Sequence, residues 1–146
     1  MELRVMRIED YDAVCALWLS CAGMGLNDLD DSREGIARFL RRNPNTSFVA
    51  VDGEEVVGIV LAGHDGRRGY IYHAAVHERC RRQGVGTRLV EAALEAMKAE
   101  GIHKVALLVF NRNAAGNAFW ERQGFAVRTD VAYRNRALTE LIRIDT

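Results

Sequence analysis

Apolar and polar residues recur along this chain with two different periods. Alternation, or a short run that is apolar throughout, predicts a β-strand, whereas apolar residues three to four positions apart predict a helix with one buried face. In chain order the pattern predicts a strand over 3–7, a helix capped by Glu9 or Asp10, and a second helix capped near Asp31 or Ser32. Strands follow over 47–51, 55–61 and 70–77, then a helix over 87–99, a strand over 104–110, a helix over about 114–123, and a terminal hairpin of 125–133 with 138–144. The order is therefore β-α-α-β-β-β-α-β-α-β-β.

Turn residues join the three middle strands. Asp52-Gly53 is a strong signal for a tight hairpin turn, and the glycine-bracketed segment 63–69 turns the chain again. Asn43-Pro44 ends the second helix, because proline disfavours helical backbone in the residue before it. We therefore expect three antiparallel strands that lead directly to residue 77.

The segment Arg81-Arg82-Gln83-Gly84-Val85-Gly86-Thr87 follows these strands and precedes an amphipathic helix. The first N–H groups of a helix have no intrahelical partner and lie at the positive end of its dipole, so they attract phosphate. Gly84 and Gly86 remove Cβ atoms that would keep a ligand away from this backbone, and Arg88 adds positive charge. The segment predicts a diphosphate site, and a turn without a ligand is the alternative.

Residue spacing decides between the classes of diphosphate site. A dinucleotide-binding fingerprint requires a third glycine where Leu89 stands, and the Walker pattern is absent. The pattern that matches is R-x-x-G-x-G, formed by Arg81, Gly84 and Gly86. It resembles the acetyl-CoA signature of the GCN5-related N-acetyltransferases, the GNAT family. Two further segments resemble the family in order and separation: 72–77, and Asn113-x-x-Gly116-Asn117-x-Phe119-Trp120-Glu121-x-x-Gly124-Phe125.

The resemblance covers essentially the whole chain. It implies a single domain over 1–146 with an α/β (α+β) fold, in which a central, mixed, mostly antiparallel sheet of about seven strands carries helices on both faces. It also implies an enzyme, an acetyl-CoA-dependent N-acetyltransferase in which an amine attacks the thioester directly in a ternary complex, without a metal. Transfer of another acyl group and non-catalytic sensing of acyl-CoA are the alternative interpretations.

The resemblance also assigns residues to the cofactor. The pantetheine arm is expected between two strands that splay apart, hydrogen-bonded to the backbone around Ala74 and Val76, with an N–H near Val76 stabilising the oxyanion. The diphosphate is expected on the backbone of 82–87. The full expected set is Ala74, Val76, Arg81 as a charge partner, Arg82, Gln83, Gly84, Val85, Gly86, Thr87, Asn113, Asn117 and Trp120. Helix capping alone is the alternative for the two asparagines, and a core role for the tryptophan.

Trp120 departs from the family pattern. Many members have a tyrosine at this position as the proposed acid for the departing thiolate, and an indole cannot donate an acid proton. The loss is tolerable because an alkyl thiol has a pKa of about 8.5, so that its thiolate leaves readily. Water or Tyr133 is the expected proton donor.

His73 is the candidate general base, acting directly or through water. The attacking amine must be neutral, and histidine has an unperturbed pKa suited to removing its proton near neutral pH. His73 stands three residues before Val76 in the strand that precedes the signature. A structural histidine in the sheet is the alternative, and Tyr72, Glu78 and His64 remain open as other candidates.

The acceptor site is expected at the two N-terminal helices and the loop between them. In this hypothesis apolar side chains form a wall, Trp18, Met24 and Leu26, while carboxylates attract a cation, Asp28, Asp30 and Asp31. It favours a small amine or the amino group of a peptide or protein as acceptor. An acidic surface loop that also caps the second helix is the alternative.

Composition limits the remaining possibilities. Twenty Lys and Arg residues balance twenty Asp and Glu residues, so no global field favours nucleic acid or an anionic membrane. Cys15, Cys21 and Cys80 form no metal-binding pattern, no plausible disulfide framework and no nucleophile setting. Free thiols, and apolar runs too short for a bilayer, predict a cytoplasmic protein. We expect a monomer or a homodimer.

Overall fold

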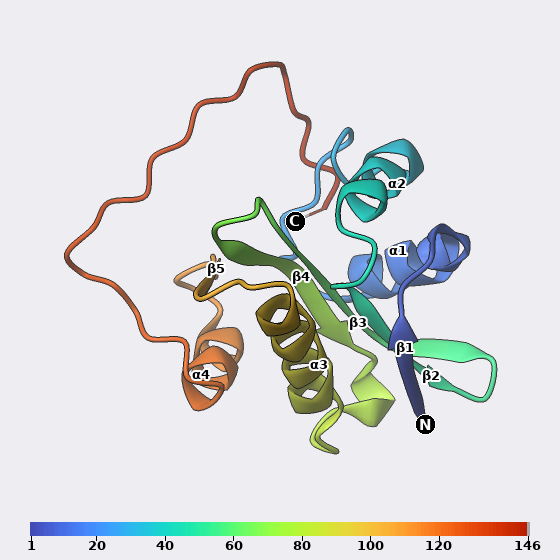
Figure 1. Ribbon diagram of the computed structural model, residues 1–146. Helices are drawn as coiled ribbons and strands as arrows, with labels where there is room; N and C mark the ends of the chain where they lie inside the picture. Colours follow the sequence, from blue (N-terminus) through green and yellow to red (C-terminus); the bar gives the residue numbers. More distant parts are fainter. Residues whose placement is uncertain (146) are drawn as a thin grey trace.

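Five β-strands form one sheet at the centre of the computed structural model, which describes residues 1–145 (Figure 1). In sheet order, which is also chain order, they are β1 (Glu2–Val5), β2 (Phe48–Asp52), β3 (Glu55–His64), β4 (Gly69–Val76) and β5 (Val105–Leu107). The first four pair antiparallel, and β5 runs parallel to β4. The sheet is therefore mixed and mostly antiparallel, as predicted.

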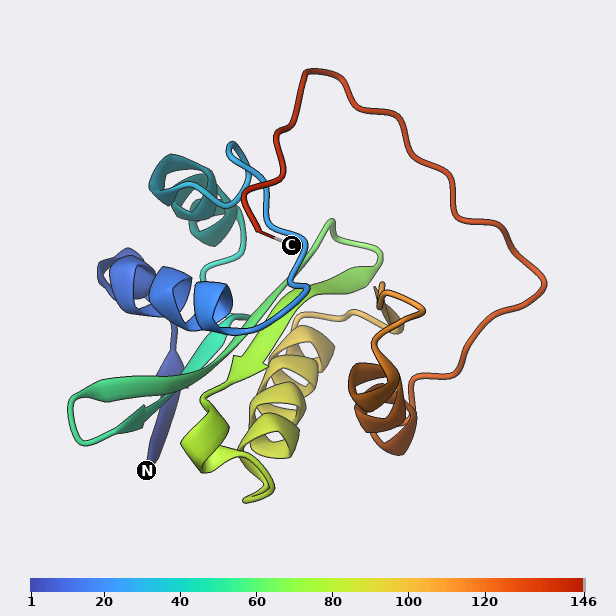
Figure 2. The ribbon, with the colours of Figure 1, turned by 180° about the vertical axis from the view of Figure 1, so that it is seen from behind.

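Helices cover both faces of this sheet. α1 (Tyr11–Ser20) and α2 (Arg33–Arg42) lie on one face, α3 (Val85–Ala99) lies on the other, and α4 (Ala114–Arg122) packs beside α3 (Figures 1 and 2). Two short 3-10 helices complete the described elements: η1 (Ile8–Asp10) precedes α1, and η2 (Glu78–Cys80) follows β4. None of the helices in the described part of the chain is long and apolar enough to cross a membrane.

Each face of the sheet has its own apolar core. Val60, Ile71, Leu89, Val90 and Met97 are among the buried residues on the α3 side. Val14, Trp18, Leu26, Ile36 and Ile59 are among those on the side of α1 and α2. Because both faces are covered, residues 57–63 of β3 are all buried, which explains why this strand is apolar almost throughout.

Local sequence accounts for the ends of several elements. The Oγ atom of Ser32 accepts a hydrogen bond of 3.0 Å from the N–H of Gly35, which caps α2 as predicted. Gly53 adopts a φ of 65° in the hairpin between β2 and β3. Gly84 adopts a φ of 78° immediately before α3. Each of these turns uses a residue type that suits its backbone conformation.

A β-bulge interrupts β4. Leu61 of β3 lies opposite His73, whereas the next residue of β3, Ala62, lies opposite Ile71, so Tyr72 is an extra residue without a partner on β3. The extra residue breaks the alternation of side chains along β4. The side chains of Tyr72 and His73 therefore both point to the face covered by α1 and α2, where each contacts an aromatic ring of these helices.

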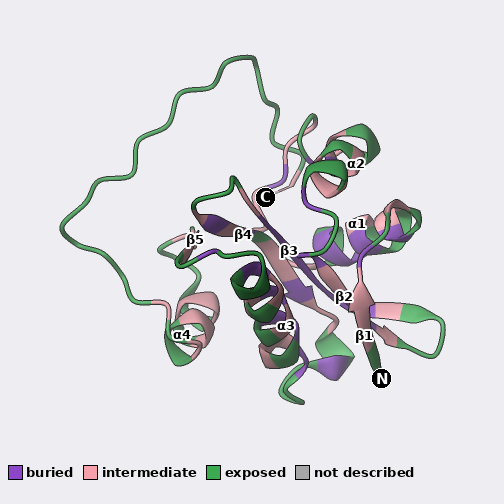
Figure 3. Cartoon of the chain, viewed as in Figure 1, coloured by how far each residue is buried: buried purple, intermediate pink, exposed green. Residues whose placement is uncertain are grey.

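The C-terminal part of the chain contradicts the sequence prediction. The hairpin expected from 125–133 and 138–144 is absent, and residues 126–144 form an exposed segment without a helix or strand, apart from an isolated bridge between Arg143 and Asn27 (Figure 3). Within residues 1–145 the sheet thus has five strands, and the prediction of about seven was wrong.

Pairing opportunities explain this difference. The sequence predicted a strand over 104–110 that is covered on both faces, but β5 spans only three residues and is half exposed. A strand this short offers few backbone groups to a further strand. The chain end pairs elsewhere. The N–H of Asp28 donates to the carbonyl of Ile142 at 3.0 Å, and the N–H of Ile144 donates to the carbonyl of Leu26 at 3.1 Å. Residues 142–145 are thereby attached to the loop between α1 and α2.

Candidate active site

β4 has an edge that β5 covers only in part. The last pair between the two strands is Ile71 with Leu107, so residues 72–76 have no described strand beside them on this side. Successive N–H groups of a strand point alternately to its two sides. Because the N–H of His77 donates to β3 at 2.7 Å, the N–H groups of Val76 and Ala74 point away from β3, to the open edge.

The turn after β4 presents free backbone N–H groups. The N–H groups of 82–87 donate no hydrogen bond to a described residue. Arg82 and Gly84 adopt left-handed conformations, with φ of 64° and 78°. A Cβ on Gly84 would have no atom within 4 Å, and the amide of Gln83 anchors the turn by donating to the carbonyl of Arg79 at 3.1 Å. A run of free donors at the N-terminus of a helix suits a phosphate.

Gly86 has a packing role that the sequence did not predict. A Cβ at this position would lie 3.2 Å from Cε1 of Phe119 and 3.7 Å from Cγ2 of Val76. The missing side chain therefore lets α4 pack against the first turn of α3. An open approach to the backbone, which was predicted for both glycines, is a property of Gly84.

The side chain of Arg81 lies at the end of the open edge. Its Nε donates to the carbonyl oxygen of Val76 at 3.1 Å, and its Nη2 lies 3.6 Å from Sγ of Cys21 at the end of α1. The hydroxyl of Thr87 accepts a hydrogen bond of 2.9 Å from the amide of Gln123. These contacts connect the turn to β4, α1 and the end of α4.

His73 is held by a carboxylate from the loop between α1 and α2. Its Nε2 lies 2.8 Å from Oδ1 of Asp31, and Trp18 packs edge-on against the imidazole at a centroid distance of 5.0 Å. The side chains of His73 and Asp31 are only 11% and 6% exposed. The Nδ1 atom of His73 is buried and has no hydrogen-bond partner among the described residues. This geometry supports the structural interpretation of His73, and its role as a base remains a prediction.

The same loop uses most of its carboxylates for its own structure. Asp31 accepts from the N–H of Asn27 at 2.9 Å, and Asp28 accepts from the N–H of Ile142 at 2.8 Å. Asp30, in contrast, is exposed, and within the described chain its carboxylate bonds only to the side chain of Asn27, at 3.0 Å. Asp30 is therefore the most exposed of the three predicted aspartates, whereas Asp28 is half-buried and Asp31 is buried. No group of three potential metal ligands gathers among residues 1–145.

The predicted apolar wall of the acceptor site is not formed. Trp18 and Leu26 are completely buried in the core beneath α1, and Met24 packs against the same core while remaining half-buried. Large apolar side chains point inward because burial of each contributes roughly 1.5 to 3 kcal/mol to folding. Sequence position alone did not distinguish these core residues from a ligand wall.

The two predicted asparagines make local hydrogen bonds at the start of α4. Asn113 caps this helix by accepting a bond of 2.9 Å from the N–H of Gly116. Asn117 donates to the carbonyl oxygens of Phe110 and Asn113 at 3.0 and 2.8 Å. The capping interpretation explains both residues, and contact with a cofactor remains a prediction.

Trp120 and Tyr133, the two aromatic candidates after the signature, occupy different surroundings. Trp120 packs edge-on against Phe119 and Phe125, with centroid distances of 4.9 and 5.4 Å, and contacts the core on the α3 side. This is the core role stated as its alternative. Tyr133 is 61% exposed in the segment after α4, and its hydroxyl makes no hydrogen bond with a described residue. Its role as an acid remains a prediction.

Tyr70, Tyr72 and Phe39 form a surface aromatic group that sequence reasoning missed. The rings of Tyr70 and Tyr72 stack with a centroid distance of 5.5 Å, and the Phe39 ring of α2 meets Tyr72 edge-on, also at 5.5 Å. Burial raises the pKa of Tyr72, and so do the neighbouring Tyr70, Asp30 and Asp65. One signal was present: the two tyrosines stand two residues apart in a predicted strand and so share a face.

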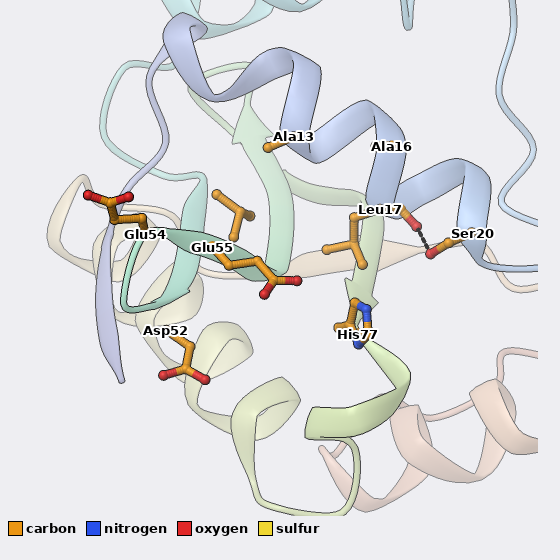
Figure 4. Close-up of a pocket in the computed structure, with 9 residues that line it drawn as sticks. Ala13, Ala16, Leu17, Ser20, Asp52, Glu54, Glu55 and His77 are labelled. Atoms are coloured by element: carbon orange, nitrogen blue, oxygen red, sulfur yellow. Dashed lines mark hydrogen bonds between the residues drawn. The ribbon is translucent and has the colours of Figure 1, made fainter.

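Two open grooves lie near these elements. The smaller, of about 420 Å³, is lined by Ala22, Gly23, Phe110, Arg112 and Asn113, between the end of α1 and the start of α4. The larger, of about 760 Å³, lies between α1 and the β2–β3 hairpin (Figure 4), and its lining is Ala13, Ala16, Leu17, Ser20, Asp52, Glu54, Glu55, Val56 and His77. Its small apolar residues come from α1 and its carboxylates from the hairpin. The smaller groove contains the predicted residue Asn113, whereas the larger contains none.

Comparison with known proteins identifies the family. The family model described as the acetyltransferase (GNAT) family matches residues 11–125. This chain belongs to the GNAT family. An acetyltransferase of Sodalis glossinidius, SG1711, is 31% identical over 140 residues, which cover 96% of this chain and 97% of that protein. The protein is thus a GNAT acetyltransferase, as the sequence resemblance predicted.

Solved structures confirm the GNAT fold. Ard1 from Thermoplasma volcanium superposes with a TM-score of 0.74 at 24% identity, covering 87% of this chain and 83% of that one. PaiA N-acetyltransferase from Thermoplasma acidophilum, in complex with coenzyme A, superposes with a TM-score of 0.73 at 17% identity, covering 87% and 90%. At these identities the similarity extends to the fold alone.

Proposed function

We propose that this GNAT protein transfers the acetyl group of acetyl-CoA to a primary amine, by direct attack of the amine in a ternary complex. One observation carries the proposal: the open edge of β4 is followed, after the short 3-10 helix η2, by a turn whose backbone N–H groups donate no hydrogen bond to a described residue. Such a surface suits a ligand with an extended arm that ends in a diphosphate. Acetyl-CoA has this shape, and it supplies an activated thioester.

The chain would hold this ligand mainly through backbone atoms. The N–H groups of 82–87 are assigned to the diphosphate, and those of Ala74 and Val76 to the arm, because they point to the open edge. Arg81 adds positive charge beside the carbonyl of Val76. The side chains at these positions matter less than the backbone, apart from Gly84, where a larger side chain would occupy space that is open in the structure, beside the N–H groups of the turn.

The proposed reaction needs an oxyanion donor, a base and a route for the proton of the thiol. The N–H of Val76 is assigned to the thioester oxygen, and fixed donors of this kind contribute roughly 3 to 4 kcal/mol. His73 is assigned as the base; Asp31 occupies its Nε2, so Nδ1 is the atom left to receive the proton. The thiolate leaves without an acid and is protonated by water or Tyr133.

Calorimetric binding of acetyl-CoA and CoA tests the cofactor half of this proposal. Gly84→Glu places a carboxylate before the free N–H groups and should weaken both ligands at least about tenfold. Gly53→Glu is the matched control, because Gly53 also has a positive φ of 65° and open space around it, yet lies in the β2–β3 hairpin. Equal binding by the two variants would contradict the assignment of the turn.

Thiol release in the presence of different amines tests the acceptor half. Mixtures of acetyl-CoA with small amines, diamines and peptides should show amine-dependent release of CoA by the wild-type protein. The acetylated amine, identified by mass spectrometry, would establish the acceptor class. Binding of acetyl-CoA without release by any amine would contradict the proposed reaction.

A further inference from the structure

Tyr72 presents a large aromatic ring to solvent on the same strand that carries the proposed acyl site. It is 54% exposed, although it belongs to a strand whose neighbours Ile71 and Ala75 are buried. The bulge in β4 directs it to the face of α1 and α2. It is also the first residue of β4 beyond the last pair with β5, so it lies where the open edge begins.

The surroundings of Tyr72 form a small aromatic platform. Tyr70 stacks on it with an interplanar angle of 29°, and Phe39 meets it edge-on at 83°. Gly63 of β3 makes room for Phe39, because a Cβ there would lie 2.6 Å from its Cζ. We call Tyr70, Tyr72 and Phe39 the aromatic platform.

The loop that carries Asp30 meets β4 next to Tyr72, because Oδ1 of the following residue, Asp31, lies 2.8 Å from Nε2 of His73. Burial is the main cause of the raised pKa of Tyr72, and the carboxylates of Asp30 and Asp65 contribute to it. Asp30 forms no ion pair with a described residue, so its charge is available. Asp65 accepts bonds of 2.8 Å from the N–H groups of its own turn, and Arg42 offsets part of its charge. Asp30 is therefore the principal acidic neighbour of the platform.

We propose that the aromatic platform and Asp30 bind an ammonium group of an aliphatic diamine or polyamine, which is the acceptor of the proposed acetyl transfer. Ring faces carry negative electrostatic potential, and a cation over a tyrosine next to a carboxylate is stabilised by both. The inference rests on the proposed function and adds the chemical class of its acceptor.

The chemistry requires two amino groups rather than one. The amine that attacks the thioester must be neutral and forms the new C–N bond, while the C–S bond breaks and the proton of the amine passes to the base or to water. An amine held as a cation on the platform cannot attack. A diamine satisfies both requirements, because one ammonium group stays on the platform while the other end loses its proton and reacts.

A matched pair of probes tests this inference: 1,5-diaminopentane and 5-amino-1-pentanol. They have the same length, and only the diamine carries a second ammonium group. The wild-type protein should use the diamine with a kcat/KM at least about tenfold higher. Tyr72→Leu and Asp30→Asn should each remove most of this preference by raising the KM of the diamine, with the KM of acetyl-CoA unchanged within twofold.

Two variants serve as controls for these measurements. Tyr72→Phe keeps the ring and should keep the preference, which separates cation binding from a role of the hydroxyl. Asp12→Asn removes an exposed carboxylate of α1, whose side chain is 92% exposed, and should change nothing. In Asp30→Asn the remaining amide oxygen can still accept the bond from Asn27, so the loop should stay folded.

Binding measured without turnover separates the two proposals. Calorimetry with CoA present should show that the diamine binds to the wild-type protein and at least tenfold more weakly to Tyr72→Leu, even if no acetylation occurs. Equal kcat/KM for the two probes in the wild type, or a preference that survives Tyr72→Leu, would overturn the inference while leaving the acetyl transfer intact. Absence of diamine binding would overturn it as well.

Discussion

The Nε2 atom of His73 lies 2.8 Å from Oδ1 of Asp31, and this pair joins β4 to the loop between α1 and α2. Both side chains are almost completely buried. Asp31→Asn should therefore lower the free energy of unfolding by about 2 kcal/mol, because a buried imidazole loses its charged partner. Chemical denaturation measures this. Asp28→Asn, in a more exposed part of the loop, should cost less than half as much, and equal stability of Asp31→Asn and wild type would contradict the structural role.

Gly86 and Phe119 provide a second test, of packing rather than charge. Gly86→Ala places a Cβ 3.2 Å from the ring and should lower the free energy of unfolding by about 1 kcal/mol. Phe119→Leu in the same chain should recover part of this loss, because the smaller side chain makes room. A thermal denaturation series of the two single variants and the double variant measures the coupling. Strictly additive effects would mean that the two positions do not interact.

Asp10 should contribute a pH-dependent part of the stability. Burial alone would raise the pKa of Asp10, but hydrogen bonds from Arg4 and from the N–H of Arg7, all of 2.8 Å, hold it below its ordinary value of 3.8. A carboxyl with a lowered pKa in the folded state stabilises the fold above its unfolded pKa and loses this effect as the pH falls through its folded pKa. Asp10→Asn should thus cost about 2 kcal/mol at pH 7 and progressively less below pH 3.8.

Urea titrations at several pH values measure this difference. Asp12→Asn is the control, because its carboxylate is exposed and lies 3.8 Å from Arg33. It should change stability by less than about 0.5 kcal/mol at every pH. If the difference in the free energy of unfolding between Asp10→Asn and wild type stays constant across the acidic range, ionisation of Asp10 contributes nothing to stability.

Asp145 should protect backbone amides of the loop between α1 and α2. Its carboxylate accepts bonds of 3.0 and 2.8 Å from the N–H groups of Gly25 and Leu26, far away in sequence. Asp145→Ala should increase the rate of hydrogen exchange at these two amides at least about tenfold. Asp130→Ala, in the exposed segment, should leave the exchange at Gly25 and Leu26 unchanged, and unchanged exchange in Asp145→Ala would show that the chain end does not hold the loop.

Several turns and helix ends could be predicted from local sequence rules. The hairpin at Asp52-Gly53, the cap at Ser32 and the helix that begins after Gly84 each depend on residues close together in the chain, so their pattern was sufficient. The fold class followed from the resemblance to the GNAT family and is confirmed.

Features that depend on distant residues did not follow from the sequence. The bulge at Tyr72 is determined by the pairing of β4 with β3, and the role of Gly86 by Phe119 of a later helix. The alternation of apolar and polar residues in about the last 20 positions predicted strands. A strand also needs the free edge of another strand to pair with, and this alternation says nothing about whether such an edge is present. Trp18 and Leu26 were predicted to line the acceptor site, but both are buried in the core. Apolar residues near a loop can belong either to a core or to a ligand site, and the sequence pattern does not distinguish the two.

The extra residue in β4 divides the strand into two parts that can change independently. Tyr70 and Tyr72 face the side of α2, whereas the N–H groups of Ala74 and Val76 are oriented by the pairing that resumes after the bulge. Substitutions at Tyr70 or Tyr72 would alter the surface proposed for the acceptor while leaving in place the pairing of residues 73–76 with β3, which orients the proposed donors. In such a strand, acceptor preference can evolve while recognition of the acyl donor is preserved.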